Sequence, residues 1–519
     1  MQEYVTEHWQ IRKAAVHGDN GLVASQHHLA SDVGAAVLRD GGNAVDAAIA
    51  TGLALGTVEP WMSGIGGGGY MTVYLAASDT VQVVEFGMRA PYAAIPEDYP
   101  LASGGTGADT FNWPKVIGDT NVHGPLSAAV PGYVKGVSMA LNKFGTKSWG
   151  DIIEPACELA EWGLPIDWFS SRMISGLARG LAQYEQTRLT YLADGLPPVA
   201  DADGNIKTLR LGRLAETYRR LQSAGPDDYY HGETAYLLAR DLEAVGSRIR
   251  NRDLAEYEAS IELPLTLDYR GARLFVPGNL TAGPSIVQAL GFLAEKSITA
   301  SSAPDLDTYH GYADALLKTY QYRLKEMGAG IPTNTTHICT ADKQGNIVSL
   351  TQTIMSGFGS RIMSPGTGVL MNNGMMWFDP RPGGPNSVLG GRRPLSNMCP
   401  VIVRQSDGSI FAVGACGGRK IFPAVFQLVS FMVDFSMDID TAIHQARLDV
   451  SGTDLVTLMS HMDPAIIDSM QSLYKETRVR PNGVSPNLFA LPQIVQRKAD
   501  GTFSGGCFIP SPHAKVAAI

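Results

Sequence analysis

The sequence of 519 residues has little of what marks a secreted, metal-binding or nucleic-acid-binding chain. It has no basic block, and its formal net charge of −9 argues against nucleic acid and anionic membrane as partners. The five cysteines are scattered without a C-x-x-C pair, so they predict neither a disulfide framework nor a zinc site. The histidines form no H-E-x-x-H pattern, and we expect no metal and no organic cofactor.

Long apolar runs are also missing. Residues 1–18 carry charges but not the apolar segment of a signal peptide, and no run is long enough to span a bilayer. The default expectation is therefore a cytoplasmic protein without a membrane partner. Hydrophobic residues make up 45% of the chain, which suffices for a large buried core in one or several domains.

A glycine-rich run, Gly64 to Gly69, formally spells G-x-G-x-x-G. Dinucleotide binding requires a strand before this motif and a helix after it. Here the order is reversed, because a helix limited by Pro60 comes first and a strand, Tyr70 to Leu75, follows. We therefore reject a nucleotide-binding oxidoreductase and predict a tight crossing of the backbone.

Other local patterns predict a chain of mixed helices and strands. Asn43 caps a helix, with Asp46 three residues later in a variant of the capping box, and Ser31-Asp32 can cap the helix before it. Further strands are predicted at 21–25, 81–86, 401–404 and 410–415. Further helices are predicted at 148–162, 233–245, 286–293, 309–325 and 420–435.

Two β-rich runs, 335–341 and 347–353, flank a cluster of turn residues and predict a hairpin. A turn centred near Gln344 places Thr335 opposite Thr353, with Cβ atoms about 4.5–5.5 Å apart. One hypothesis is a plain hairpin, since Thr favours strands. The other is an N-terminal nucleophile, whose freed α-amine, with a pKa of about 7.7–8.0, serves as its own base. The preceding connector, Gly328 to Asn334, is a place where a cut would be tolerated.

Two other places could contribute to such a site. Arg89 follows a strand and is either a solvated strand end or a ligand for a substrate carboxylate. Gly417 and Gly418 stand between a strand and a helix, where unobstructed N–H groups could form an oxyanion hole. Two glycines there could equally serve a sharp turn.

Taken together, the chain resembles the γ-glutamyltranspeptidase (glutathione hydrolase) family of N-terminal-nucleophile hydrolases. The resemblance runs along nearly the whole chain and is densest at 21–69, 335–353, 394–403 and 414–418. It implies an α+β fold, a four-layer αββα sandwich. It also implies self-cleavage between Asn334 and Thr335, after which a large subunit, 1–334, and a small catalytic subunit, 335–519, form one body.

The same resemblance implies roles for individual residues. Thr335 corresponds to the nucleophile and Thr353 to its hydroxyl partner, while Gly417 and Gly418 correspond to the oxyanion-hole glycines. Ser396 stands where the family places a serine that binds the substrate carboxylate.

The residues that hold a glutamyl group in typical members are largely replaced. An Arg-Glu pair, an Asn, a Gln, an Asp and a second Ser are expected there, and the aligned residues are Gly87, Met88, Met355, Gly374, Trp377 and Asn397. A charged ammonium buried there without partners would be costly. We expect the substrate to be bound instead by Arg89, Ser396, Asn397 and Asn373.

The sequence thus predicts a self-processing threonine amidohydrolase or acyltransferase that cleaves a small amide through an acyl-enzyme. The acyl group is γ-glutamyl or a related one; the replacements favour a different acyl group, as in relatives acting on glutaryl-cephalosporins or oxamate, which would need an anchor such as Arg89. The expected partner of each fragment is the other one, in a heterodimer or a dimer of heterodimers. An unprocessed binding protein on the same scaffold is the alternative, and the intact catalytic set argues against it.

Overall fold

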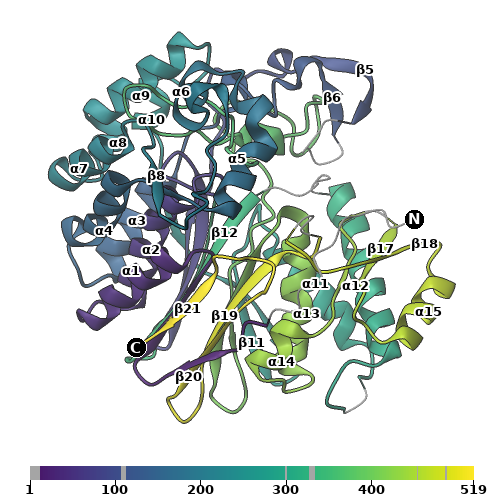
Figure 1. The fold of residues 1–519 in the computed structure, drawn as a ribbon. Coiled ribbons are helices and arrows are strands. Elements are labelled where there is room, and N and C mark those ends of the chain that lie inside the picture. The colour runs from purple at the N-terminus through teal and green to yellow at the C-terminus, as the bar shows by residue number, and fades with distance from the viewer. Residues whose placement is uncertain (1–11, 107–112, 299–300, 327–333, 453, 485–487) are drawn as a thin grey trace.

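The computed structural model describes residues 12–106, 113–298, 301–326, 334–452, 454–484 and 488–519. Within them, two seven-stranded sheets pack face to face and helices cover both outer faces (Figure 1). This is the four-layer αββα sandwich predicted from the sequence.

The first sheet has the predicted hairpin at its centre. Its order is β21 (Lys515–Ala518), β2 (Gly21–Ser25), β12 (Asn334–Asp342), β13 (Ile347–Met355), β3 (Gly68–Leu75), β4 (Thr80–Phe86) and β9 (Ser260–Glu262). All neighbours are antiparallel. Every residue of β13 is buried, because this strand lies between the second sheet and a helical layer.

The second sheet carries the strand that leads into the two candidate oxyanion glycines. Its order is β1 (Val16–Gly18), β20 (Phe503–Cys507), β19 (Leu491–Arg497), β15 (Ile410–Cys416), β14 (Val401–Arg404), β11 (Ala272–Val276) and β10 (Leu265–Tyr269). Strands from both ends of the chain enter each sheet, so the segments before and after residue 334 share one core.

Helices from different parts of the chain cover the two faces. Against the first sheet lie α1 (His28–Arg39), α2 (Ala44–Val58) and α3 (Tyr133–Phe144). Outside them are α4 (Trp149–Trp162), α5 (Trp168–Leu181), α6 (Glu185–Tyr191), α7 (Leu214–Ala224), α8 (Asp228–His231), α9 (Glu233–Ala244) and α10 (Asn251–Ala255). The second sheet is covered by α11 (Gly283–Ala294), α13 (Ile421–Val433) and α14 (Ile439–His444), with α12 (Leu306–Glu326) and α15 (Pro464–Leu473) outside.

Smaller elements complete the described fold. Short strands are β5 (Leu101–Thr106), β6 (Pro114–Val116), β7 (Leu164–Ile166), β8 (Lys207–Leu209), β16 (Leu448–Asp449), β17 (Leu455–Met459) and β18 (Glu476–Arg480). Single 3₁₀ turns occur at Pro96–Asp98, Ile117–Asp119, Pro125–Ser127, Ala193–Gly195, Gly374–Trp377 and Gly418–Lys420. None of the described helices combines the length and the apolar character of a membrane span.

The predicted elements are confirmed with shifted ends. The capping box of α2 forms as predicted, since Asn43 Oδ1 accepts from two backbone N–H groups and Asp46 Oδ2 accepts from Asn43 N–H. The preceding helix begins earlier than expected, with His27 as its N-cap. The reason is that Ser31 is buried and bonds Ser25 and Lys515 instead of capping a helix. Of the predicted connector, residues 328–333 lie outside the described chain.

Candidate active site

The hairpin of β12 and β13 has the register predicted from its turn, starting with Thr336 opposite Gln352. If this register continued by one more residue, Thr335 would pair with Thr353. Instead the ladder shifts between Asn334 and Thr336, and Thr335 falls at this irregularity. Irregularities of this kind often re-aim side chains next to active sites.

Thr335 and Thr353 are both buried, each 1% exposed. Thr353 Oγ1 accepts the backbone N–H of Met355 at 2.7 Å. Thr335 Oγ1 makes no hydrogen bond to any described residue. A hydroxyl without a nearby base is a weak nucleophile. In the uncut chain the nitrogen of Thr335 is still an amide, so the residue cannot yet supply its own base.

The backbone of the glycine-rich run, Gly64 to Gly69, packs directly against the backbone of β13. A Cβ at Gly67 would lie 2.2 Å from the carbonyl oxygen of Thr353, and one at Gly69 would lie 2.4 Å from that of Thr351. Only glycine permits this approach. The predicted backbone crossing is confirmed, and it supports the segment that carries Thr353.

The two sheets meet closely where β12 faces β15. A Cβ at Gly414 would lie 2.2 Å from His337 Cε1, and further along β12, Ala341 shares an apolar cluster with Ala412. The start of β12 and the end of β15 also approach the same side chain, since Thr336 bonds Glu59 and Cys416 is within electrostatic reach of Glu59.

The backbone beyond Cys416 adopts a conformation that requires glycine. Gly417 has φ of 134° and Gly418 has φ of 61°, both in the left-handed region. A Cβ at Gly417 would also lie 2.9 Å from Ala490 Cα. The steric need for glycine at this turn is therefore real, and the oxyanion-hole role of these residues stays a prediction.

Glu59 is a buried carboxyl group next to the nucleophile segment that the sequence reading missed. It follows α2 at its C-cap, and Thr336 Oγ1 donates to Glu59 Oε2 at 2.9 Å. Burial raises the pKa of Glu59 to about 8. The Glu59 carboxyl group in turn helps to raise the pKa of Cys416 at the end of β15, after the larger effect of burial. An acidic residue directly after a largely apolar helix, before Pro60, was the available signal.

Ser396 and Asn397 lie against a buried arginine. Arg323 Nη2 donates to the Ser396 carbonyl at 2.7 Å and to Asn397 Oδ1 at 3.2 Å. Ser396 Oγ accepts the N–H of Met398 at 3.1 Å, and Asn397 Nδ2 is buried without a hydrogen-bond partner among the described residues. Arg323, on α12, was not predicted, because nothing local in a helix indicates that its charge points inward.

Three of the positions aligned with glutamyl-binding residues, Met88, Met355 and Trp377, belong to a methionine-rich cluster. We use this term for the cluster that contains Tyr70, Met88, Ala90, Ala94, Tyr99, Trp113, Val116, Ala129, Met355, Met375, Met376, Trp377, Phe378, Val388 and Met398. Met88, Met355 and Trp377 are at most 2% exposed. Here these side chains pack against one another and offer no charge to an ammonium group.

Asn373 closes the loop that borders this cluster. Its Oδ1 accepts the N–H of Ser356 at 2.9 Å, and its Nδ2 donates to the Val122 carbonyl at 2.6 Å and to Ser356 Oγ at 2.9 Å. The amide is thus engaged by protein on both sides. Its predicted role toward substrate stays a prediction, and its observed contacts organise the loop.

Arg89 makes its hydrogen bonds to α10 and its surroundings. Its Nη1 donates to the Glu256 carbonyl at 2.8 Å and to Tyr92 Oη at 3.2 Å, and its Nη2 donates to the Asp253 carbonyl at 2.9 Å. The guanidinium also lies over the Tyr92 ring. None of these contacts joins Arg89 to the threonine hairpin.

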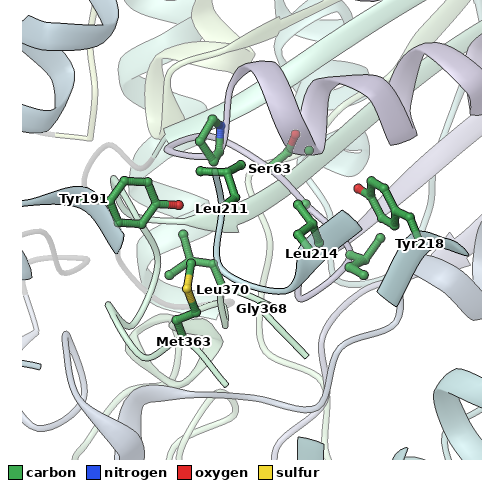
Figure 2. A pocket seen from close by; sticks show the side chains of 12 residues that line it. Ser63, Tyr191, Leu211, Leu214, Tyr218, Met363, Gly368 and Leu370 are labelled. Atoms are coloured by element: carbon green, nitrogen blue, oxygen red, sulfur yellow. The ribbon is translucent and has the colours of Figure 1, made fainter. Parts of the chain in front are cut away.

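A small cavity lies behind the glycine-rich run (Figure 2). Tyr191, Leu211, Met363 and Leu370 surround it together with Ser63, and its volume is ≈ 20 Å³. That is room for about one water molecule, too little for a substrate. Among the described residues, no group of three or more His, Cys, Asp or Glu side chains is arranged to hold a metal ion.

Comparison with known proteins agrees with the sequence resemblance. A family model described as gamma-glutamyltranspeptidase matches residues 30–330 and 319–507. The chain is 31% identical over 488 residues to a glutathione hydrolase proenzyme of Bacillus subtilis, covering 83% of this chain and 81% of that protein. It is 31% identical over 479 residues to an acylase ACY 1 proenzyme of a Pseudomonas species, covering 85% and 84%. A cephalosporin acylase structure from Bacillus halodurans has the same fold, with a TM-score of 0.83, 23% identity and coverage of 100% and 99%.

Proposed function

We propose that Thr335 is the catalytic nucleophile of this protein. The chain belongs to the gamma-glutamyltranspeptidase family and is an N-terminal-nucleophile amidohydrolase or acyltransferase. We further propose that the chain cuts itself between Asn334 and Thr335 into pieces 1–334 and 335–519, which remain together as a heterodimer. The shared core of the two segments supports this, since neither piece would bury its apolar faces alone.

Self-cleavage and turnover would use the same atoms. In the uncut chain Thr335 Oγ attacks the carbonyl carbon of Asn334, the C–N bond breaks and leaves an ester, and water hydrolyses the ester. The freed amine then accepts the hydroxyl proton when Thr335 attacks a substrate amide. Thr353 orients the nucleophile, and the N–H groups of Gly417 and Gly418 stabilise the oxyanion. Water resolves the acyl-enzyme, or an amine does so in a transfer reaction.

The observation that supports this role most directly is the state of the Thr335 hydroxyl. It is buried, without a hydrogen-bond partner in the described chain, at the point where the β12 ladder shifts. The other two threonines of β12, Thr336 and Thr340, each donate a hydrogen bond to a neighbour, so Thr335 differs from them in the state of its hydroxyl.

The acyl group we propose lacks a charged α-amino group. Three of the aligned glutamyl-binding positions, Met88, Met355 and Trp377, lie in the methionine-rich cluster, and their own side chains carry no negative charge for a buried ammonium. An amide of the glutaryl or oxamyl type fits this constraint better than a γ-glutamyl amide, and the similarity to an acylase proenzyme is consistent with it.

A denaturing gel and a substrate panel test both statements. Wild type should give two bands, Thr335→Ala one band without turnover, and Thr335→Ser two bands. Initial rates on glutaryl-anilide should exceed those on γ-glutamyl-anilide at equal concentration. A single band in active wild type would refute self-processing, and a preference for γ-glutamyl-anilide would refute the altered acyl specificity.

A further inference from the structure

Two buried arginines lie beside the candidate oxyanion turn and the Ser396–Asn397 segment. Arg419 directly follows Gly418 and is 1% exposed, and Arg323 is 3% exposed. The hydroxyl of Tyr320 donates to the Arg419 carbonyl at 2.6 Å, and the Tyr320 side chain is within electrostatic reach of both guanidinium groups. Burying two guanidinium groups together is unfavourable unless anions or hydrogen-bond acceptors compensate.

Arg323 is well supplied with acceptors. Its Nη1 donates to the Thr281 carbonyl and to Ser285 Oγ, both at 3.0 Å. Its Nη2 is bonded to the Ser396–Asn397 segment, as described above. These contacts fix the guanidinium but contain no carboxylate, so its positive charge is not neutralised by them.

The guanidinium group of Arg419 has acceptors for only some of its N–H groups. Its Nη1 donates to the Ser451 carbonyl, but Nε and Nη2 are buried and have no hydrogen-bond partner in the described chain. Leaving a buried donor unsatisfied costs more free energy on a charged group than on a neutral one. Such a group is expected where a ligand supplies the missing acceptors.

The local charge balance is positive. Among the described residues, the carboxyl group within electrostatic reach of Arg419 and Lys420 is that of Asp449, whereas the groups that act on Arg323 are Tyr320 and Cys399. Burial raises the pKa of Asp449, which favours its neutral form, and its Oδ1 has no described hydrogen-bond partner. Burial lowers the pKa of Arg419 only to about 10, so this side chain stays charged at neutral pH.

We propose that Arg419, together with Asn397 Nδ2, binds a carboxylate group of the substrate, with Arg323 holding Asn397 in place. Asn397 Nδ2 is also a buried donor without a hydrogen-bond partner among the described residues, and Arg323, which is within electrostatic reach of Arg419, bonds the other end of the same amide. A carboxylate accepts two parallel hydrogen bonds from the edge of a guanidinium group. This proposal rests on the proposed function, and it assigns the carboxylate anchor to this region instead of to Arg89.

The carboxylate could belong to the acyl group, as in a glutaryl amide, or to the leaving amine, as in an N-acyl amino acid. Both present the same anion to Arg419. They differ in which side of the scissile bond carries the charge, so paired substrates can separate them.

Binding can be measured without turnover. In thermal unfolding of the processed protein, glutarate or N-acetylglycine should raise the Tm of wild type, and the neutral diamide glutaramide should not. Arg419→Gln should lose this shift. Arg447→Lys, a change at an equally buried arginine that contacts Phe508, should keep it. No shift for wild type with either anion, or an unchanged shift in Arg419→Gln, overturns the proposal.

Kinetics then identify the source of the carboxylate. For an acyl-side carboxylate, Arg419→Lys should raise KM for glutaryl-anilide at least tenfold and change kcat/KM for its neutral methyl ester less than threefold. For a leaving-group carboxylate, the same split should appear between N-butyrylglycine and its amide. Equal losses on both members of both pairs mean a structural role and overturn the proposal. Failure of self-cleavage in wild type counts instead against the proposed function, and the same thermal-unfolding measurement on the uncut chain then tests carboxylate binding by itself.

Discussion

His337 lies against Gly414 so closely that a Cβ at residue 414 would stand 2.2 Å from the imidazole Cε1. The ring is fully buried between the sheets, and its Nδ1 is 2.8 Å from Thr351 Oγ1. Burial lowers the pKa of His337 to about 3, so the ring is neutral at physiological pH. This contact sets the spacing of the sheets two residues from Thr335 on one strand and from Cys416 on the other.

Replacing Gly414 should therefore destabilise the interface between the sheets. Gly414→Ala forces the ring or a strand to move, and we expect a loss of about 1–3 kcal/mol in the free energy of unfolding. His337→Ala in the same chain should recover part of this loss, which a double-mutant cycle in urea measures. Gly176→Ala, on α5 with nothing near its Cβ, is the control and should be neutral or stabilising. Additive effects at 337 and 414 would contradict the contact.

The buried Glu59 should make stability depend on pH. Its folded pKa is raised to about 8, above the ordinary value of 4.5. Between these two values the unfolded chain releases the proton and the folded chain keeps it, so stability falls as pH rises, by up to about 1.4 kcal/mol per pH unit. Below pH 4.5 both states hold the proton and this cost is absent.

Glu59→Gln should remove that slope while keeping an acceptor for Thr336. Urea unfolding at several pH values from 5 to 8 tests this, with Glu158→Gln on the exposed side of α4 as the control. If Glu59→Gln and wild type lose stability in parallel across this range, the carboxyl group is already ionised in the folded protein.

Thr353→Val should slow the reaction without unfolding the protein. It removes the oxygen that accepts the Met355 N–H, at a position we assign to orienting the nucleophile. A misplaced nucleophile can cost about 100-fold in rate, and we expect that loss in kcat and slower self-cleavage on a gel. Thr340→Val removes a hydrogen bond to the Ala44 carbonyl farther along β12 and should reduce stability alone. Equal kcat values for the two variants would argue against the role of Thr353.

The thiols should be unreactive in the folded protein. All five cysteines are free and buried, and burial raises the pKa of Cys507 to about 12. Because the thiolate is the reactive form, a thiol reagent should label none rapidly under native conditions and five after denaturation. Rapid labelling of any thiol in the native protein would show an opening that the structure does not contain.

Local sequence patterns were enough for elements whose signals lie within a few residues. The turn after β12 set the hairpin register, and the Asn43–Asp46 pair began α2 as expected, because turn and capping chemistry act over three or four residues. The Gly64 to Gly69 run was also read correctly from the order of its flanking elements. The start of α1 was missed because Ser31 is engaged by β2 and the last strand, which no local pattern reveals.

The sequence by itself determined the hairpin, the glycine positions and the family to which the chain belongs, because these depend on residue order and spacing. Only the tertiary structure decided which charges are buried and what surrounds them. Glu59, Arg323 and Arg419 come from three distant segments, and their chemistry follows from a low-dielectric environment that neighbouring elements create together.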